Sequence, residues 1–256
     1  MNLCHAIIFG IVEGISEFLP ISSTGHLILT AQLLNIAQSD FIKSFQIIIQ
    51  LGAICSVVVL YFKSLVTDIP TIKKIMAALI PTLVIGFIFY KLVKRLLLGN
   101  SHVVIWSLLI GGICLIVFEL LHRERADATD SVEKISYRQA VIIGLFQSIA
   151  IIPGVSRSAA TILGGLLLGL KRRTIVEFSF LLAVPTMLAA TVLDLSKNLN
   201  AFSGDQFLFL LTGFVTSFIV ALFAIKFLLN FINKHSFIAF GVYRIIIALL
   251  FFFLVL

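Results

Sequence analysis

The sequence predicts an all-α polytopic membrane protein, with six transmembrane helices and two re-entrant helix–loop–helix hairpins arranged as an inverted-topology repeat. The prediction rests on the composition, on six long apolar stretches, and on two apolar regions with polar interruptions. Of the 256 residues, 60% are hydrophobic and 12% are charged, and the mean hydropathy is +1.16. Soluble domains are about 45–50% apolar and about 25% charged. A soluble enzyme, a disordered tail and a disulfide scaffold are therefore excluded.

Six apolar stretches are long enough to cross about 30 Å of hydrocarbon as helices. They are residues 45–62, 76–92, 103–121, 178–195, 207–229 and 237–256. The second stretch is interrupted by Pro81. No stretch alternates polar and apolar residues as the strands of a membrane barrel do, so every crossing is expected to be helical.

Two further apolar regions are each broken in the middle. Residues 5–36 contain the run Pro-Ile-Ser-Ser-Thr-Gly-His from Pro20, and residues 139–170 contain Pro-Gly-Val-Ser-Arg-Ser from Pro153. A polar, helix-breaking segment is tolerated at membrane depth only where protein buries it or where it lines a wet cavity. We interpret both regions as re-entrant hairpins.

The two hairpins resemble one another in sequence. Residue numbers raised by 134 pair Gly10 with Gly144 and Ser22 with Ser156. The order of elements also repeats, because each hairpin is followed by three predicted spans. The similarity indicates an internal repeat.

The repeat divides a single integral membrane domain, residues 1–256, into a first unit of residues 1–121 and a second unit of residues 139–256. A hairpin returns to its own side of the membrane, so each unit crosses the membrane only through its three spans. Because three is an odd number, the second unit is inverted relative to the first. Inverted repeats with broken helices place a binding site near the midplane. The two breaks are expected to face each other there.

The formal net charge of +7 predicts an orientation. Eleven lysines and arginines fall in the predicted loops on one side and five on the other. The positive-inside rule places the richer side in the cytoplasm and both termini outside. Basic loops without an aromatic-basic recognition motif do not make a nucleic-acid-binding protein, so we expect no nucleic acid partner. We expect membrane lipids to surround the chain.

Three charged residues lie inside the hairpins, namely Glu13, Glu17 and Arg157. A charge within hydrocarbon costs at least about 2.5–3.5 kcal/mol, so each needs a partner or a task. A buried ionic lock between the two halves is one explanation. The breaks also gather seven further polar residues, which a lock does not need and which favour a functional site: Ser22, Ser23, Thr24, His26, Ser156, Ser158 and Thr161.

The chemistry that these residues suggest is phosphate chemistry. Each break opens a new helix, whose N-terminal N–H groups attract anions, and Arg157 can hold phosphate oxygens bidentately. Paired carboxylates beside hydroxyls and a histidine form a metal site or an acid–base pair. The residues expected to bind substrate are Ser22, Thr24, Ser156, Ser158 and Thr161, with Gln46 and Gln50 lining the pocket.

Two segments carry a family resemblance. Glu-Gly-Ile-Ser-Glu-Phe-Leu-Pro-Ile-Ser-Ser-Thr-Gly-His from Glu13 and Pro-Gly-Val-Ser-Arg-Ser-Ala-Ala-Thr from Pro153 resemble the two signature motifs of bacterial undecaprenyl-diphosphate phosphatases, also called bacitracin-resistance proteins. The resemblance extends over the whole chain, and Tyr243-Arg244 in the last span is also similar to the family pattern.

The resemblance implies hydrolysis of undecaprenyl diphosphate to undecaprenyl phosphate and inorganic phosphate, which recycles the lipid carrier for peptidoglycan synthesis. It further implies a multi-pass protein of the bacterial cytoplasmic (inner) membrane, with a site open to the outer side. A polyprenyl diphosphate substrate for which bacitracin competes, and a requirement for Mg²⁺ or Ca²⁺, are also implied. Homo-oligomerisation is left open.

The roles within the site follow as hypotheses. Arg157 stabilises charge on the transferring phosphoryl group, and Glu17, with Glu13, binds the cation or acts as acid–base. The nucleophile is Ser23, activated by Glu17 or His26, or else His26 itself or a water.

Two other functions compete with phosphatase activity. Inverted repeats with broken helices are typical of secondary transporters, here for a phosphate-bearing or other anionic solute. A non-catalytic lipid-binding scaffold would not explain intramembrane charge. Arg244, about two turns into the last span, is expected to reach toward the cytoplasmic interface in a structural role.

Overall fold

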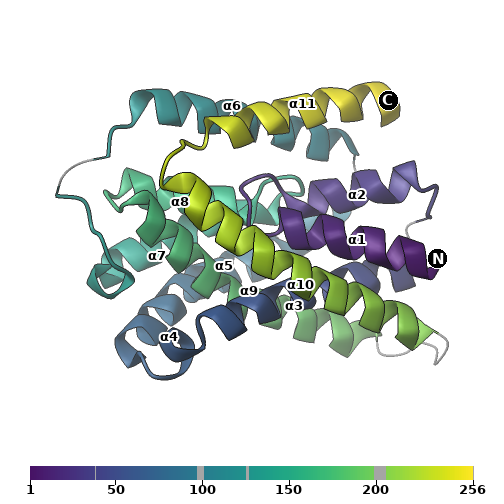
Figure 1. Ribbon diagram of the computed structural model, residues 1–256, viewed down its shortest axis with the longest axis horizontal. Coiled ribbons are helices and arrows are strands. Elements are labelled where there is room, and N and C mark those ends of the chain that lie inside the picture. The colour runs from purple at the N-terminus through teal and green to yellow at the C-terminus, as the bar shows by residue number, and fades with distance from the viewer. Residues whose placement is uncertain (38, 97–100, 125–126, 199–205, 256) are drawn as a thin grey trace.

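The computed structural model describes residues 1–37, 39–96, 101–124, 127–198 and 206–255 (Figure 1). Across those residues the chain forms eleven α-helices and two short 3₁₀ helices. Their bounds are α1 Leu3–Ser16, α2 Ser23–Leu33, α3 Asp40–Leu60, α4 Phe62–Val66, α5 Ile69–Leu96, α6 Ser101–Leu121, η1 Val132–Lys134, α7 Tyr137–Ser148, η2 Ile149–Ile151, α8 Arg157–Leu167, α9 Arg172–Asn198, α10 Phe207–Ile232 and α11 Ile238–Val255. The prediction of an all-helical fold is confirmed.

Five of the described helices are long and apolar enough to cross a membrane, namely α3, α5, α6, α9 and α10. They coincide with the first five predicted spans, so the prediction of a polytopic membrane protein is also confirmed. The sixth predicted span corresponds to α11, which is a shorter apolar helix. Leu256, the predicted end of that span, lies outside the described residues.

Several helices are longer than the spans that the sequence predicts. The third helix begins at Asp40 instead of residue 45, and α9 begins at Arg172 instead of residue 178. The apolar run ends at the nearby basic residues, but the helix does not, because lysine and arginine are good helix formers whose long side chains reach water. Pro81 also leaves α5 unbroken.

Both predicted interruptions are breaks between helices. The first separates α1 from α2, and the second separates α7 and the short η2 from α8. Local capping explains where the helices of the second pair begin. Ser136 and Gln139 form a capping box at the start of α7, and the Ser156 hydroxyl accepts the Ala159 N–H at 3.1 Å at the start of α8.

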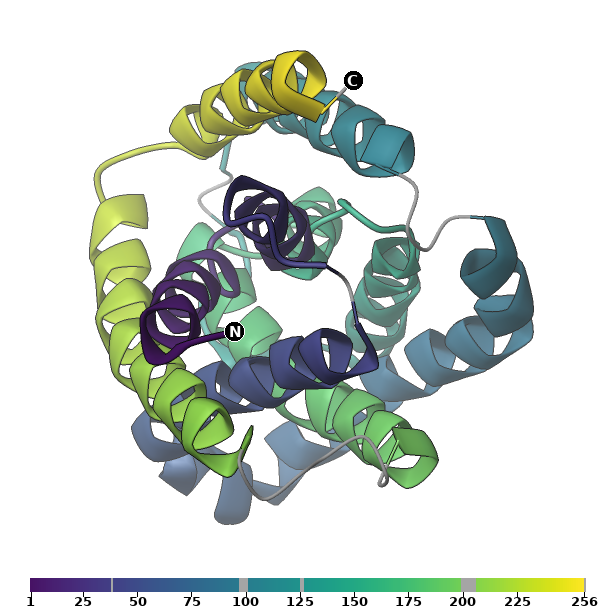
Figure 2. The same cartoon turned by 90° about the vertical axis from the view of Figure 1, so that its right-hand side faces the viewer.

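The two broken pairs occupy equivalent places in the chain. Ser23–Leu33 and Arg157–Leu167 are both 11-residue helices, and their bounds differ by the same 134 residues as the sequence repeat. In space, α1 packs along α10 and α7 packs along α5, while α6 pairs with α11. Figure 1 shows the α1–α10 and α6–α11 pairs side by side, and Figure 2 shows α2 inside a ring of longer helices.

The largest apolar core lies where the first break meets α8 and α9. Phe18 in the break is fully buried, and its ring contacts the ring of Phe180 edge-to-face at a centroid distance of 5.2 Å. Ala159 and Ile162 of α8 belong to the same cluster. Because this core excludes water beside the breaks, it places their polar groups in a low-dielectric environment where electrostatic interactions are strong.

Candidate active site

The two breaks are tied together by side chains that donate to their backbone carbonyls. Arg244 of α11 donates from Nη1 to the Pro20 carbonyl at 3.3 Å and from Nη2 to the Gly154 carbonyl at 3.2 Å. The Ser158 hydroxyl donates to the Phe18 carbonyl at 2.8 Å. These bonds hold the breaks from the two halves of the chain at one place, as the sequence predicts.

Ser23 and Glu17 form the central contact of the first break. Ser22 precedes α2 with φ 74° and ψ 93°, a left-handed conformation that costs a residue other than glycine roughly 1–3 kcal/mol. Ser23 follows as the first residue of the helix, and its Oγ donates to Oε2 of Glu17 at 2.5 Å. Both residues are buried. A serine hydroxyl is therefore held against a carboxylate that can accept its proton.

Arg157 brings a positive charge to the same carboxylate from the opposite break. Its Nη2 lies 3.3 Å from Oε1 of Glu17, and the two side chains are only 8% and 2% exposed. Its Nη1 donates to the Ser179 carbonyl at 2.9 Å. Its Nε is buried and has no hydrogen-bond partner among the described residues. The guanidinium is thus fixed in place, and one of its N–H donors has no partner within the described residues.

Glu13 lies fully buried beside Glu17. No donor among the described residues hydrogen-bonds to either of its carboxylate oxygens. Two carboxylates facing one guanidinium leave one negative charge without a counterion when both are ionised, and a buried unpaired charge is costly. Neutralisation requires a bound proton or a bound cation.

The same two carboxylates fit a divalent cation. Oxygen ligands are those that Mg²⁺ and Ca²⁺ prefer, and Mg²⁺ is commonly held by one or two carboxylates plus substrate phosphates and water. Within the described part of the chain no group of three or more His, Cys, Asp or Glu could hold a metal ion. Glu13 and Glu17 could therefore supply two ligands, and substrate oxygens and water would have to supply the others.

His26 uses both of its ring nitrogens within the protein. Nδ1 lies 2.8 Å from the Ser22 carbonyl oxygen, and Nε2 lies 2.8 Å from the Tyr243 hydroxyl. The His26 and Tyr243 rings are stacked, with centroids 5.5 Å apart and an interplanar angle of 4°. In this arrangement neither nitrogen is free to attack a phosphorus atom, which favours Ser23 among the three nucleophiles that the sequence left open.

The three hydroxyls of the second break are engaged in bonds within the protein. Ser156 caps α8, and Ser158 bonds to the first break. Thr161 lies 2.6 Å from the Ser179 hydroxyl and also donates to carbonyls of its own helix. In this structure these side chains therefore stabilise the second break and the helix that begins at Arg157.

The other residues predicted to bind substrate are less closely tied to the centre. Ser22 is buried in the turn and makes no side-chain cap, whereas Thr24 is exposed at the start of α2. Gln46 and Gln50 are half-buried on α3, and Nε2 of Gln46 is buried without a hydrogen-bond partner among the described residues.

Arg244 does not reach toward the cytoplasmic interface, so that expectation was wrong. It is 1% exposed and donates to the carbonyls of Ser107 and Leu108 as well as to the two breaks. The unpaired carbonyls at helix breaks attract a guanidinium more strongly than distant water does. The site contact of Tyr243 was also missed. Its only sequence signal was the Tyr243-Arg244 similarity to the family pattern.

Comparison with known proteins identifies the family. Residues 6–250 match the family model described as bacitracin resistance protein BacA. The chain belongs to this family. A relative named undecaprenyl-diphosphatase from Aquifex aeolicus is 55% identical over 98% of this chain and 98% of its own length. Relatives of the same name from Sulfurihydrogenibium sp. and Campylobacter jejuni are 52% and 47% identical, and each alignment covers at least 95% of both chains.

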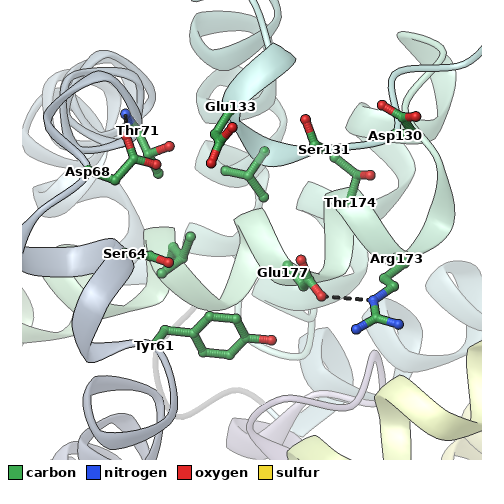
Figure 3. Close-up of a pocket in the computed structure, with 12 residues that line it drawn as sticks. Tyr61, Ser64, Asp68, Thr71, Asp130, Ser131, Glu133, Arg173, Thr174 and Glu177 are labelled. Carbon is green, nitrogen blue, oxygen red and sulfur yellow. Dashed lines mark hydrogen bonds and ion pairs between the residues drawn. The ribbon is translucent and has the colours of Figure 1, made fainter.

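This member of the bacitracin resistance protein family also has a cavity of about 250 Å³ that contains none of the predicted site residues. Four carboxylates line it, together with Tyr61 and Arg173: Asp68, Asp130, Glu133 and Glu177. Figure 3 shows the ion pair of Arg173 with Glu177, whose atoms are 3.0 Å apart. The cavity lies among loops predicted to be cytoplasmic, apart from the candidate active site.

Proposed function

We propose that Ser23, Glu17 and Arg157 carry the phosphatase chemistry of this chain. The chain is an undecaprenyl-diphosphatase, the name that its full-length relatives bear. The observation behind the residue assignment is the continuous set of contacts from the Ser23 hydroxyl to Glu17 at 2.5 Å and from Glu17 to Arg157 at 3.3 Å. A nucleophile, a proton acceptor and a phosphate-binding cation are thereby joined across the two breaks.

The reaction begins with attack of Ser23 Oγ on the terminal phosphorus of undecaprenyl diphosphate. The hydroxyl proton passes to Glu17, a bond forms between Oγ and phosphorus, and the bond from phosphorus to the bridging oxygen breaks. Undecaprenyl phosphate leaves and takes the proton from Glu17. A water then attacks the phosphorus of the phosphoserine and gives a proton to Glu17, and the bond from phosphorus to Ser23 Oγ breaks. Inorganic phosphate is released, and the proton passes from Glu17 to Ser23 Oγ.

Arg157 holds the terminal phosphate and stabilises the charge that spreads over its equatorial oxygens during transfer. Its bond to the Ser179 carbonyl fixes the guanidinium, so little reorganisation is needed when the substrate binds. The buried Nε has no partner among the described residues, and a bound phosphate oxygen would satisfy it. The N-terminal amides of α2 and α8 lie at the same breaks and add further donors.

The assignment of Glu13 is to cation binding. Glu13 and Glu17 would hold Mg²⁺ or Ca²⁺, which would neutralise the excess carboxylate charge and offset the negative charge of the diphosphate when bound. The buried, unpartnered oxygens of Glu13 support this role.

The membrane architecture is part of the proposal: six spans and two re-entrant hairpins in inverted repeats of residues 1–121 and 139–256. Two observations support it. The helices α2 and α8 are offset by the repeat distance, and α1 packs on α10 just as α7 packs on α5. Each hairpin thus packs on the second long helix of the opposite half, as a two-fold axis in the membrane plane requires.

The same proposal sets the orientation and the partners. Loop charge supports cytoplasmic placement of the cavity-bearing side, and the site would then open to the outer side of the bacterial cytoplasmic membrane. There it would meet undecaprenyl diphosphate, for which bacitracin would compete.

The test is phosphate release from a polyprenyl diphosphate by the purified chain in detergent with Mg²⁺ or Ca²⁺. We expect release by the wild type and by Ser64→Ala, a control in the separate cavity, and none by Ser23→Ala. Acid quenching with substrate labelled in the terminal phosphate should trap a phosphoserine at Ser23.

Two results would contradict the proposal. Absence of phosphate release across a range of pH and cations would refute the enzyme and revive the transporter. Ser23→Ala activity above about a tenth of wild type would transfer the nucleophilic role to His26 or to water.

A further inference from the structure

Tyr243 contacts the candidate active site from the last helix of the chain. Its hydroxyl lies 2.8 Å from Nε2 of His26, although 217 positions separate the two residues. The neighbouring Arg244 binds the Pro20 carbonyl. Helix α11 therefore contacts the first break at Pro20 and the first turn of α2 at His26. Neither contact involves an atom that reacts in the proposed mechanism.

The hydrogen-bond partners of His26 fix its tautomer. The Ser22 carbonyl can only accept a hydrogen bond, so the proton lies on Nδ1. In the neutral ring Nε2 is then an acceptor, and the Tyr243 hydroxyl is the donor. The hydrogen bonds that the two ring nitrogens make to neighbouring residues determine which nitrogen carries the proton.

The Nδ1–H of His26 in turn holds the turn that carries Ser23. Ser22 has a left-handed backbone, and its own side chain makes no capping bond. Its carbonyl accepts from both the backbone N–H of His26 at 3.3 Å and the ring Nδ1–H at 2.8 Å. A strained backbone conformation persists only where surrounding contacts impose it, and the ring of His26 supplies one of them.

We propose that Tyr243 is a positioning residue for the phosphatase reaction, which holds His26 in its Nδ1–H tautomer so that His26 fixes the Ser22 turn and places Ser23 against Glu17. The inference rests on the proposed nucleophilic role of Ser23. It assigns His26 to positioning the nucleophile and not to attack on phosphorus.

The test uses Tyr243→Phe, which retains the ring and removes only the hydroxyl. We expect kcat for polyprenyl diphosphate hydrolysis to fall about 10- to 100-fold, the loss that follows removal of a hydrogen bond that orients a functional histidine. KM should stay within about twofold of wild type because Arg157 still binds the phosphate. The control is Tyr137→Phe, an exposed tyrosine at the start of α7, which should retain wild-type kinetics.

A second readout separates positioning from general structural damage. The chain, labelled with ¹⁵N-histidine, contains five histidines, and the His26→Ala variant identifies the His26 signals. Wild type should show a protonated Nδ1 and a hydrogen-bonded Nε2, and Tyr243→Phe should shift the Nε2 signal and mix the tautomers. In a His26→Ala background, Tyr243→Phe should cause less than a twofold further loss of kcat.

Each outcome decides the inference. A wild-type kcat in Tyr243→Phe, a kcat loss with unchanged His26 signals, or full additivity with His26→Ala would overturn it. Failure of the proposed function is distinguishable, because Ser23→Ala would then retain activity or no phosphoserine would form, whereas the ¹⁵N signals report the Tyr243–His26 contact without turnover.

Discussion

Arg157 and Glu17 form a buried ion pair, with Nη2 and Oε1 3.3 Å apart, between residues separated by 140 positions. One arises from each broken helix pair, so the contact joins the two halves of the chain. The other oxygen of Glu17 accepts the hydroxyl of Ser23 at 2.5 Å. An ionic lock and a reactive centre, which were competing explanations of the sequence, therefore share the same carboxylate.

Arg157→Lys should reduce kcat/KM at least about 100-fold, as loss of an oriented charge-stabilising donor does. A single ammonium cannot bond to the Ser179 carbonyl, Glu17 and a phosphate with the geometry of a planar guanidinium. Phosphate release from a polyprenyl diphosphate measures the effect. Arg173→Lys, in the separate cavity, is the matched control and should be unaffected. A loss of less than about fivefold would mean that charge alone suffices at this position.

Glu13→Gln should lower the affinity of the enzyme for the cation more than its affinity for the lipid substrate. The substitution keeps the volume of the side chain but removes one of two carboxylates that would hold the ion, so the cation concentration for half-maximal activity should rise about tenfold or more. Titration of Mg²⁺ and of Ca²⁺ into the metal-depleted enzyme provides the measurement, with Asp130→Asn as the control. An unchanged midpoint would show that Glu13 balances charge by holding a proton.

The sequence predicted the parts of the fold that depend on local apolarity and on the cost of buried charge. The two breaks and the meeting of Glu17 with Arg157 follow from those costs. The extended starts of α3 and α9 could not be predicted in this way, because hydropathy marks the edge of the hydrocarbon and not the end of the helix.

The role of Arg244 was not predictable for a different reason. A snorkelling arginine and a buried one have the same local sequence, and only tertiary packing shows that carbonyls from both breaks face this side of α11. The contact between Tyr243 and His26 also forms only after α11 has packed. A sequence shows which charged residues are costly to bury. The backbone carbonyls that bind them are present at every residue, so the sequence does not show which carbonyls will be the partners.

Arg244→Met should destabilise the protein by about 3 kcal/mol, because it leaves the buried carbonyls of Pro20 and Gly154 without donors. The guanidinium bonds to four carbonyls in two breaks and one helix. Thermal unfolding in detergent should show the loss, and Arg173→Met should change the midpoint little because its pair is half-exposed. Equal midpoints for the two variants would rule out a clamping role for Arg244.

Gly144→Ala should separate α7 from α5 and thereby disturb the second break. A Cβ at this position would clash with the Ala78 carbonyl and come within 2.8 Å of Cγ of Pro81, and these neighbours are backbone or ring atoms that cannot rotate away. Overpacking of this kind costs about 1–3 kcal/mol. The carbonyl of Gly144 itself accepts a hydrogen bond from the Thr82 hydroxyl at 2.9 Å, and that bond should lengthen or break as well.

Gly86→Ala, within α5, is the matched control because a Cβ there meets nothing within 4 Å. Alanine is the better helix former by about 0.8–1.0 kcal/mol, so this variant should be unchanged or more stable. Thermal unfolding and phosphate release on the same preparations compare the two variants. If Gly144→Ala lowers stability and activity together while Gly86→Ala lowers neither, close packing of α7 on α5 is required to hold the break that carries Arg157. Equal behaviour would show that the break keeps its geometry without that contact.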